Sequence, residues 1–258
     1  MIKLEKTITP SPEQWEALIM GARNAMNSWD RYDSGDCKMI NAKCDECGKT
    51  TTNCEGCWIN DLDCEFEGFI LGPNDHQLLT KLAKAGRDHR KFMRMITVYA
   101  DITAPLYWWK EFDTYKVGTV ANSCSTMHKI HEKEFTLDDF SCEKLFAEDD
   151  TAGMYYSQTA EEEFTATDAL KVVIEALNCY RRMFLQTKDK KYWWQMIQLL
   201  PTSYNQKRTV MLNYEVLANM YKSRKNHKLD EWVEFCKWIE SLPYSELITG
   251  NFKEGENI

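Results

Sequence analysis

The sequence has no apolar run long enough to cross a membrane, which takes roughly 18 or more residues in a helix. It also lacks an excess of basic residues: 32 Lys and Arg stand against 40 Asp and Glu, for a net charge of −8. Binding a nucleic-acid polymer requires a basic face that neutralises phosphates. We therefore expect neither a membrane nor a nucleic acid as a partner, while net charge leaves room for a local basic pocket that holds one nucleotide.

Nothing in the sequence repeats, and no segment is of low complexity. Residues 1–6 are mixed and charged, without the apolar core of a signal peptide, so we expect a cytoplasmic protein. The 258 residues are 43% hydrophobic and 28% charged, a balance typical of a globular protein with a substantial core. The prediction is a single domain over residues 1–258.

Several segments carry apolar residues at helical spacing. Residues 11–27 predict a helix that Ser11 caps and whose first turn suits Pro12. The turn at Gly72-Pro73-Asn74-Asp75 predicts the start of a second helix, which Gly86 ends. Further helices are predicted over residues 160–186 (capped by Thr167 or Ser157), 190–200, 209–223 and 228–241.

Residues 92–108 alternate loosely between apolar and polar side chains, which predicts a strand interrupted near Pro105. Residues 31–67 break the pattern, because they are rich in Cys, Asp, Asn, Gly and Thr and have little apolar content. Such a segment is predicted to be an insertion that is not stabilised by a hydrophobic core of its own. The expected fold class is α+β, with helices dominating the C-terminal half.

Six of the ten cysteines fall within residues 37–64, a cysteine-rich insertion for which a metal is the simplest explanation. Two C-x-x-C turns can place four thiolates on one tetrahedral ion, and such a closed shell is structural. An iron–sulfur cluster and unmetallated or redox thiols are the alternatives, and Cys37 and Cys64 have no assigned role. The predicted structural zinc ligands are Cys44, Cys47, Cys54 and Cys57.

Residues 86–130 carry a strand-like run through Phe92 that leads to Pro105 and then to a polar segment. This order resembles the central segment of the flavin-dependent thymidylate synthases, also called thymidylate-synthase-complementing proteins. In that family a Pro is followed by R-H-R-x-x-S-x-N-E-x-S-x-R-Y. The positions that match the motif are Thr114-Tyr115-Lys116 on Arg-His-Arg, Thr119 on the first Ser, Asn122 on Asn and Ser125 on the second Ser.

The match departs from the family motif at several places. Ser123 replaces the Glu, and Met127-His128 replaces the Arg-Tyr. Upstream, Lys110-Glu111 takes the place of an Arg-Gln, and one extra residue precedes Asn122. The C-terminal half agrees better: Leu199-Leu200-Pro201 resembles the Leu-Pro that ends a family helix, and the later Asn…Leu…Leu-Arg helix is matched by Asn213, Leu217 and Arg224.

The resemblance implies a central mixed or antiparallel sheet, a homotetramer, and sites for FAD and a pyrimidine deoxynucleotide. Ser125 and Asn122 would then be catalytic. The implied nucleotide contacts are Arg224, Ser125, Thr119 and Lys116, and the implied FAD contacts are Arg94, Thr114, Tyr115 and Lys116. From the residues alone, Arg224 can equally be a solvated helix end, and Ser125 and Asn122 can make only local turn hydrogen bonds.

Two more features lie beside this segment. A basic run provides either a solvated face or a rim that binds phosphate; it consists of Arg87, His89, Arg90, Lys91 and Arg94. Cys124 lies inside the motif, where nearby cations could activate a thiolate nucleophile, although the sequence assigns it no partner.

Three functions compete. The first is a flavin-dependent thymidylate synthase-like protein that binds dUMP or a related nucleotide and transfers a one-carbon group to it. The second is a nucleotide-binding protein on the same scaffold without flavin chemistry, either a sensor or a phage-type sequestering decoy. The third is a zinc-stabilised interaction protein that docks through the cysteine cluster. The extent of the resemblance slightly favours the first.

Overall fold

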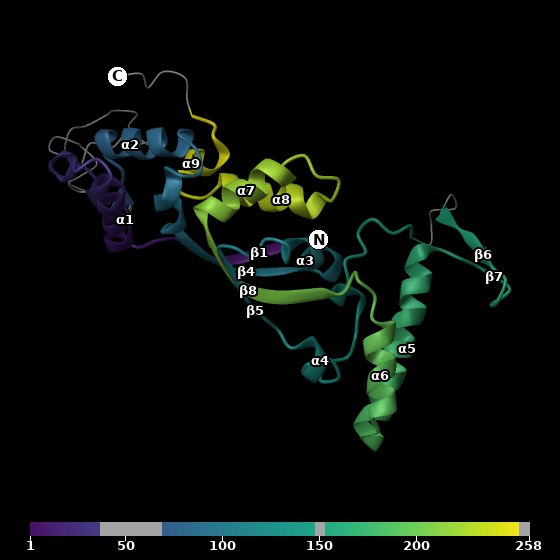
Figure 1. Cartoon of the computed structure of the whole chain (residues 1–258). Helices are drawn as coiled ribbons and strands as arrows, with labels where there is room; N and C mark the ends of the chain where they lie inside the picture. Colours follow the sequence, from purple (N-terminus) through teal and green to yellow (C-terminus); the bar gives the residue numbers. More distant parts are fainter. Residues whose placement is uncertain (37–68, 148–152, 253–258) are drawn as a thin grey trace, which may run out of the picture.

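The computed structural model describes residues 1–36, 69–147 and 153–252, and it has the predicted α+β architecture (Figure 1). Its centre is a four-stranded sheet in the order β1-β4-β8-β5, in which every neighbouring pair is antiparallel. The sheet is therefore antiparallel, one of the two arrangements that the resemblance implied. Its strands are β1 (Lys3–Ile8), β4 (Thr97–Pro105), β5 (Thr119–Ser123) and β8 (Asn205–Asn213).

One face of the sheet carries the main core. Alternate residues of β4 and β8 point to this face and are fully buried, among them Val98, Ile102 and Leu212. Aromatic side chains such as Trp108 and Trp232 pack with them in the same core. The helices that supply this layer are α3 (Leu106–Phe112), α7 (Tyr214–Arg224) and α8 (Asp230–Glu240). In Figure 1, α7 and α8 lie above the sheet.

A second helical layer comes from the N-terminal third and the C-terminus. Ser11 caps its first helix as predicted: its hydroxyl accepts from the Gln14 amide, and its own amide donates to the Gln14 side chain. Pro12 is the first residue of that helix. The layer consists of α1 (Pro12–Asn24), α2 (Pro73–Lys84), the 3₁₀ turn η3 (Arg90–Arg94) and α9 (Glu246–Thr249).

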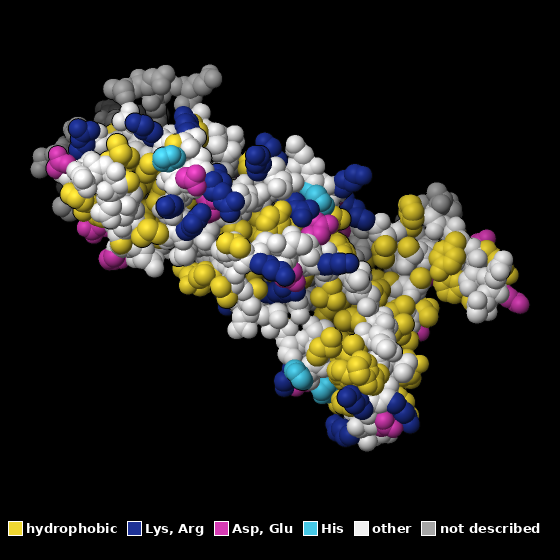
Figure 2. Space-filling model, viewed as in Figure 1, with side chains coloured by type: hydrophobic (Ala, Val, Ile, Leu, Met, Phe, Trp, Pro, Cys, Tyr) yellow, Lys and Arg dark blue, Asp and Glu magenta, His cyan; other side chains and the backbone are white. Residues whose placement is uncertain are grey.

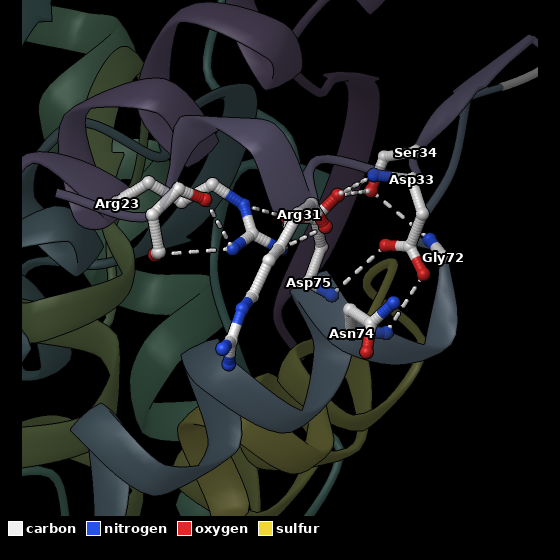
Figure 3. A network of polar contacts seen from close by, with 8 residues as sticks. Arg23, Arg31, Asp33, Ser34, Gly72, Asn74 and Asp75 are labelled. Atoms are coloured by element: carbon white, nitrogen blue, oxygen red, sulfur yellow. Dashed lines mark hydrogen bonds and ion pairs between the residues drawn. The ribbon is translucent and has the colours of Figure 1, made fainter. Parts of the chain in front are cut away.

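A buried polar network joins α1 to α2 (Figure 3). Arg23 and Asp75 form an ion pair, and the Asp75 carboxylate also accepts hydrogen bonds from the Asp33 amide and the Ser34 hydroxyl. Ser34 in turn accepts from the Gly72 amide. The network thus fixes both ends of the segment that contains the predicted insertion, at the base of the short ladder β2 (Gly35–Asp36) and β3 (Phe69–Ile70).

A helical arm projects from the sheet and has a separate small core (Figure 1). Leu177 and Met196 are buried at its centre, and Phe135 and Phe140, from the segment before the arm, pack with them. The arm consists of α5 (Ala166–Thr187), α6 (Lys190–Leu199) and the hairpin β6 (Tyr155–Ser157) and β7 (Glu162–Phe164).

Three predicted elements were partly wrong. Residues 209–223 are not one helix, because β8 runs to Asn213 and α7 begins only at Tyr214. The strand expected over 92–108 covers only Thr97–Pro105, between η3 and α3. The arm helix starts at Ala166 with Thr165 as its cap, rather than Thr167 or Ser157, since the preceding residues form the hairpin. Over the described ranges, no helix is long and apolar enough to span a bilayer.

Candidate functional site

The turn between α3 and β5 brings the motif segment against the start of α7. Gly118 has φ +86°, a conformation that favours glycine. A Cβ at this position would lie 2.7 Å from Nδ2 of Asn213, whose Oδ1 caps α7 by accepting from the Val216 amide. The Thr119 hydroxyl then donates to the Tyr115 carbonyl and closes the turn. The turn and the cap therefore fix where β5 begins relative to α7.

Arg224, at the end of α7, contacts side chains from α3, from the turn that follows α3, and from α8. Its Nη1 lies 2.5 Å from Oε2 of Glu111, and its Nε donates to the Tyr115 hydroxyl at 2.9 Å. The guanidinium carbon is 4.7 Å from the centre of the Trp232 ring and 5.6 Å from that of Tyr115. Only 18% of the side chain is exposed. We call this group, with His227, the Arg224 cluster.

The carboxylate of Glu111 organises the cluster. Its Oε2 accepts hydrogen bonds from Arg224 and, at 3.0 Å, from Nε1 of Trp232. Nε2 of His227 lies 3.5 Å from the same oxygen. One turn earlier on α3, the Tyr107 hydroxyl donates to Glu231 of α8, and burial together with that carboxylate raises the pKa of Tyr107. Tyr107 therefore stays protonated at neutral pH and holds α3 to α8, so the cluster is built on fixed elements.

The second part of the motif lies on an edge strand. Asn122 belongs to β5, pairs with Thr209 of β8 and is exposed. Ser125 is the N-cap of the short helix α4 (Thr126–Lys129), and its hydroxyl accepts from the His128 amide at 3.2 Å. Ser125 thus makes a local turn hydrogen bond, whereas no side-chain hydrogen bond of Asn122 is found among the described residues, and both residues are exposed.

Arg208 of β8 is a residue that the sequence reasoning missed. Its guanidinium lies 4.2 Å from the centre of the Trp109 ring, its Nε donates to Gln206 at 2.9 Å, and its Nη1 donates to Asp113 at 2.7 Å. It pairs across the ladder with Ser123, inside the motif segment. Residues 205–209 are all polar and give no pattern that singles out Arg208, and a helix was predicted over most of this strand.

The other predicted residues are less closely connected. Thr114 is exposed, and its hydroxyl donates to the Glu111 carbonyl at 2.7 Å. Lys116 is exposed in the turn before β5. Arg94 ends η3 and is exposed; among the described residues, no hydrogen bond or ion pair links it to the Arg224 cluster.

The predicted zinc ligands cannot be placed, because residues 37–68 lie outside the described part of the chain. Elsewhere, within the ranges that the structure covers, no group of three or more His, Cys, Asp or Glu side chains could hold a metal ion. Cys124 is a free, exposed thiol whose carbonyl accepts from Gln206 at 3.2 Å. No general base contacts that thiol among the described residues, so its role as a nucleophile stays a prediction.

Comparison with known proteins identifies the fold. The chain aligns over 96% of its length with 95% of the crystal structure of thymidylate synthase X (ThyX) from Helicobacter pylori with FAD and dUMP, at 13% identity and a TM-score of 0.55. A second structure of flavin-dependent ThyX from the same organism, complexed with FAD and dUMP, covers 98% of this chain and 99% of its own, at 13% identity and a TM-score of 0.53.

The fold is therefore that of the flavin-dependent thymidylate synthases, as the resemblance implied. A UMP/dUMP methylase, PolB from Streptomyces cacaoi, also aligns over 97% of this chain and 94% of its own, but its 11% identity and TM-score of 0.48 do not bear on that assignment. No protein-family model matches the sequence, and no curated protein matches it.

Proposed function

We propose that this protein binds a pyrimidine deoxynucleotide of the dUMP type at the Arg224 cluster. The observation that carries the proposal is the arrangement of Arg224. Two of its nitrogens are held by Glu111 and Tyr115, while Nη2 has no hydrogen-bond partner among the described residues. A planar guanidinium fixed in this way can read the edge of a pyrimidine without first losing side-chain freedom.

Support for the nucleotide class comes from the fold. Both ThyX structures that share it hold dUMP and FAD together. Ser125 and Thr119 lie on the helix cap and strand that follow the turn beside the Arg224 cluster, and they offer hydroxyl groups to a sugar or phosphate. Arg224, Ser125 and Thr119, with Lys116 in the turn, form the proposed nucleotide site. Asn122 pairs with Thr209 and so faces the other side of the sheet from Ser123 and Arg208.

The residues present fit FAD less well than they fit a nucleotide. At the positions that match Arg-His-Arg, the Tyr115 hydroxyl is bonded to Arg224, the Thr114 hydroxyl is bonded to a backbone carbonyl, and only Lys116 is a cation. A pyrophosphate is bound best by paired guanidinium groups, and one exposed ammonium is a weak substitute. Arg94 would have to supply a second charge, so we assign no reaction step to a flavin.

Two outcomes of nucleotide binding remain in competition. One-carbon transfer to dUMP is favoured by the shared fold, whose ThyX examples carry FAD beside dUMP. Binding without flavin chemistry, as in a sensor or sequestering protein, is favoured by the loss of cations at Thr114 and Tyr115. Sequestration would need only the nucleotide site described above.

We further propose that the protein is a homotetramer that associates through the helical arm, with a second copy as the occupant. Large apolar side chains are exposed along the arm and its hairpin, where Figure 2 shows yellow side chains gathered. Tyr156 is 60% exposed, Val172 51% and Trp194 43%. Light scattering should give a tetramer, and Tyr156→Glu with Trp194→Glu should dissociate it; a wild-type monomer would refute this proposal.

The first test is calorimetric titration of dUMP into the purified protein, with an absorbance spectrum of the same sample. We expect dUMP to bind, and Arg224→Gln to weaken binding about 10- to 100-fold, the loss of one or two hydrogen bonds to a charged group. Lys222→Gln removes a charge from the same helix outside the cluster and should leave affinity unchanged. No binding of dUMP by the wild type would refute the proposal.

The spectrum and an assay separate the two outcomes. Flavin bands that persist after purification, together with formation of dTMP from dUMP, would establish one-carbon transfer. A spectrum that stays free of flavin after reconstitution with excess FAD, combined with tight dUMP binding, would establish the binding protein. Metal analysis of the same sample tests the predicted structural zinc.

A further inference from the structure

Arg208 is a largely buried cation without a buried counter-charge. Its side chain is 14% exposed, whereas Asp113, its single ion-pair partner among the described residues, is 52% exposed. An ion pair with an exposed carboxylate contributes little, and such a carboxylate can be displaced. Nη2 of Arg208 has no hydrogen-bond partner within the described ranges. Nη2 is therefore available to donate hydrogen bonds to another anion.

The position of the guanidinium is fixed even without that anion. Trp109 forms a shelf beneath it, and the indole itself is held because its Nε1 donates to the Gln206 carbonyl at 2.9 Å. The amide oxygen of Gln206 accepts from Nε of Arg208. A cation stacked on an aromatic ring and bonded along one edge presents its other edge in a defined direction.

Gln206 also connects Arg208 to the motif segment. Its Nε2 donates to the Thr126 hydroxyl at 2.8 Å and to the Cys124 carbonyl at 3.2 Å, on either side of Ser125. Ser123 lies directly opposite Arg208 in the ladder, and opposite residues of an antiparallel pair share a face of the sheet. A guanidinium next to several hydroxyls is the donor set that binds phosphate.

We propose that Arg208 binds the 5′-phosphate of the nucleotide whose pyrimidine meets Arg224. This inference rests on the proposed function and adds a residue to it that the motif comparison did not supply. Of the positions that match the motif's cations, only Lys116 still carries a charge, and Met127-His128 stands at the position of the last Arg. Arg208 provides a guanidinium beside that segment from a neighbouring strand. In the free protein Asp113 forms an ion pair with Arg208, and the phosphate displaces the Asp113 carboxylate on binding.

The test compares a nucleotide with its nucleoside. Affinities for dUMP and for deoxyuridine are measured calorimetrically on the full-length protein, as wild type, Arg208→Gln and Arg208→Lys. We expect Arg208→Gln to weaken dUMP about 10- to 100-fold and to leave deoxyuridine unchanged, so that the preference for phosphate collapses. Arg208→Lys keeps the positive charge but lacks the paired N–H donors of a guanidinium. It should therefore give an intermediate preference for dUMP over deoxyuridine.

Lys207→Gln is the matched control. Lys207 precedes Arg208 on the same strand but pairs with Asp101, at 3.1 Å, on the opposite face of the sheet. It should keep the wild-type preference for dUMP over deoxyuridine. If Arg208→Gln also keeps that preference, Arg208 is structural and the inference is overturned while the proposed function stands. If the wild type binds neither compound, both fall; if Arg208→Gln does not fold, the preference of Arg208→Lys decides.

Discussion

Arg23 Nε donates to the Asp75 carboxylate at 2.6 Å, and the two side chains are only 2% and 0% exposed although 52 residues separate them. Arg23 also donates to the carbonyls of Ser28 and Arg31, so its fork is fully used (Figure 3). A buried pair of this kind contributes little over an apolar substitute, but removal of one partner strands a charge. The pair therefore behaves as a lock between α1 and α2.

Arg23→Leu should reduce the free energy of unfolding by about 3–5 kcal/mol, because Asp75 is left buried without its partner. Urea denaturation followed by tryptophan fluorescence measures the change. Arg31→Leu is the control, since Arg31 enters the network only through its backbone carbonyl, and it should change stability by less than about 0.5 kcal/mol. Equal effects of the two substitutions would contradict the role given to the pair.

We expect that the predicted cysteine-rich insertion can be removed without loss of the fold. Asp36 and Phe69 are paired at the end of the β2–β3 ladder, so two residues such as Asn-Gly can replace residues 37–68 as a hairpin turn. The Arg23–Asp75 ion pair remains. A shorter loop also loses less conformational entropy when its ends are brought together. We expect a melting temperature within a few degrees of wild type and, by metal analysis, loss of one zinc per chain. An unfolded product would show that the insertion supports the fold.

Gly118→Ala should destabilise the protein by about 1–3 kcal/mol, since it combines a positive φ with the clash against Asn213. Gly86→Ala separates the two effects: Gly86 has φ +97° but open space around its Cβ position. It should cost about 1–2 kcal/mol, from the positive φ alone, and less than Gly118→Ala. Thermal denaturation of both variants provides the comparison, and a larger loss for Gly86→Ala would refute the close approach between the turn and the α7 cap.

Burial raises the pKa of the Cys236 thiol to about 11, with a smaller contribution from the carboxylate of Glu240. At pH 8 almost no thiolate forms there, whereas Cys124 and Cys179 are exposed. Iodoacetamide labelling followed by peptide mass spectrometry should modify these two at least about tenfold faster than Cys236. Comparable rates would show that Cys236 is accessible.

The raised pKa of Cys236 also makes the stability of the protein depend on pH. A thiol in the unfolded chain ionises near pH 8.5, below the folded pKa of about 11. Between these values the unfolded state binds fewer protons than the folded state, so the contribution of Cys236 to stability falls as pH rises. Replacement of Cys236 by Ala should flatten the pH dependence of the melting temperature in this alkaline range.

How much could be predicted from sequence depended on how local each signal is. The Ser11 cap and the start of α2 at Pro73 depend on neighbouring residues and were confirmed. The β8–α7 junction was missed, because buried Val210 and Leu212 merge with the apolar face of the following helix, although Asn213 caps that helix. An N-cap signal inside an apolar run should have divided it into two elements.

The candidate site followed the same rule. The resemblance predicted Arg224, but not that Glu111 and Trp232, from two other helices, would hold it. Arg208 carried no motif signal, and its contacts with Trp109 and Asp113 depend on the way β8 lies beside α3. Contacts between residues about 100 positions apart cannot be inferred from spacing in one sequence.

Part of the motif segment forms β5, an outer strand that, among the described strands, pairs only with β8. Four of its five residues are exposed, so their side chains add little to the buried area on which folding depends. Substitutions there can change what the proposed site binds with little effect on stability, whereas truncation of Trp108 or Leu212 in the core would cost about 2–5 kcal/mol. This separation gives the scaffold a high tolerance for evolutionary drift along β5, so the residues of the proposed nucleotide site can change while every strand and helix keeps its place.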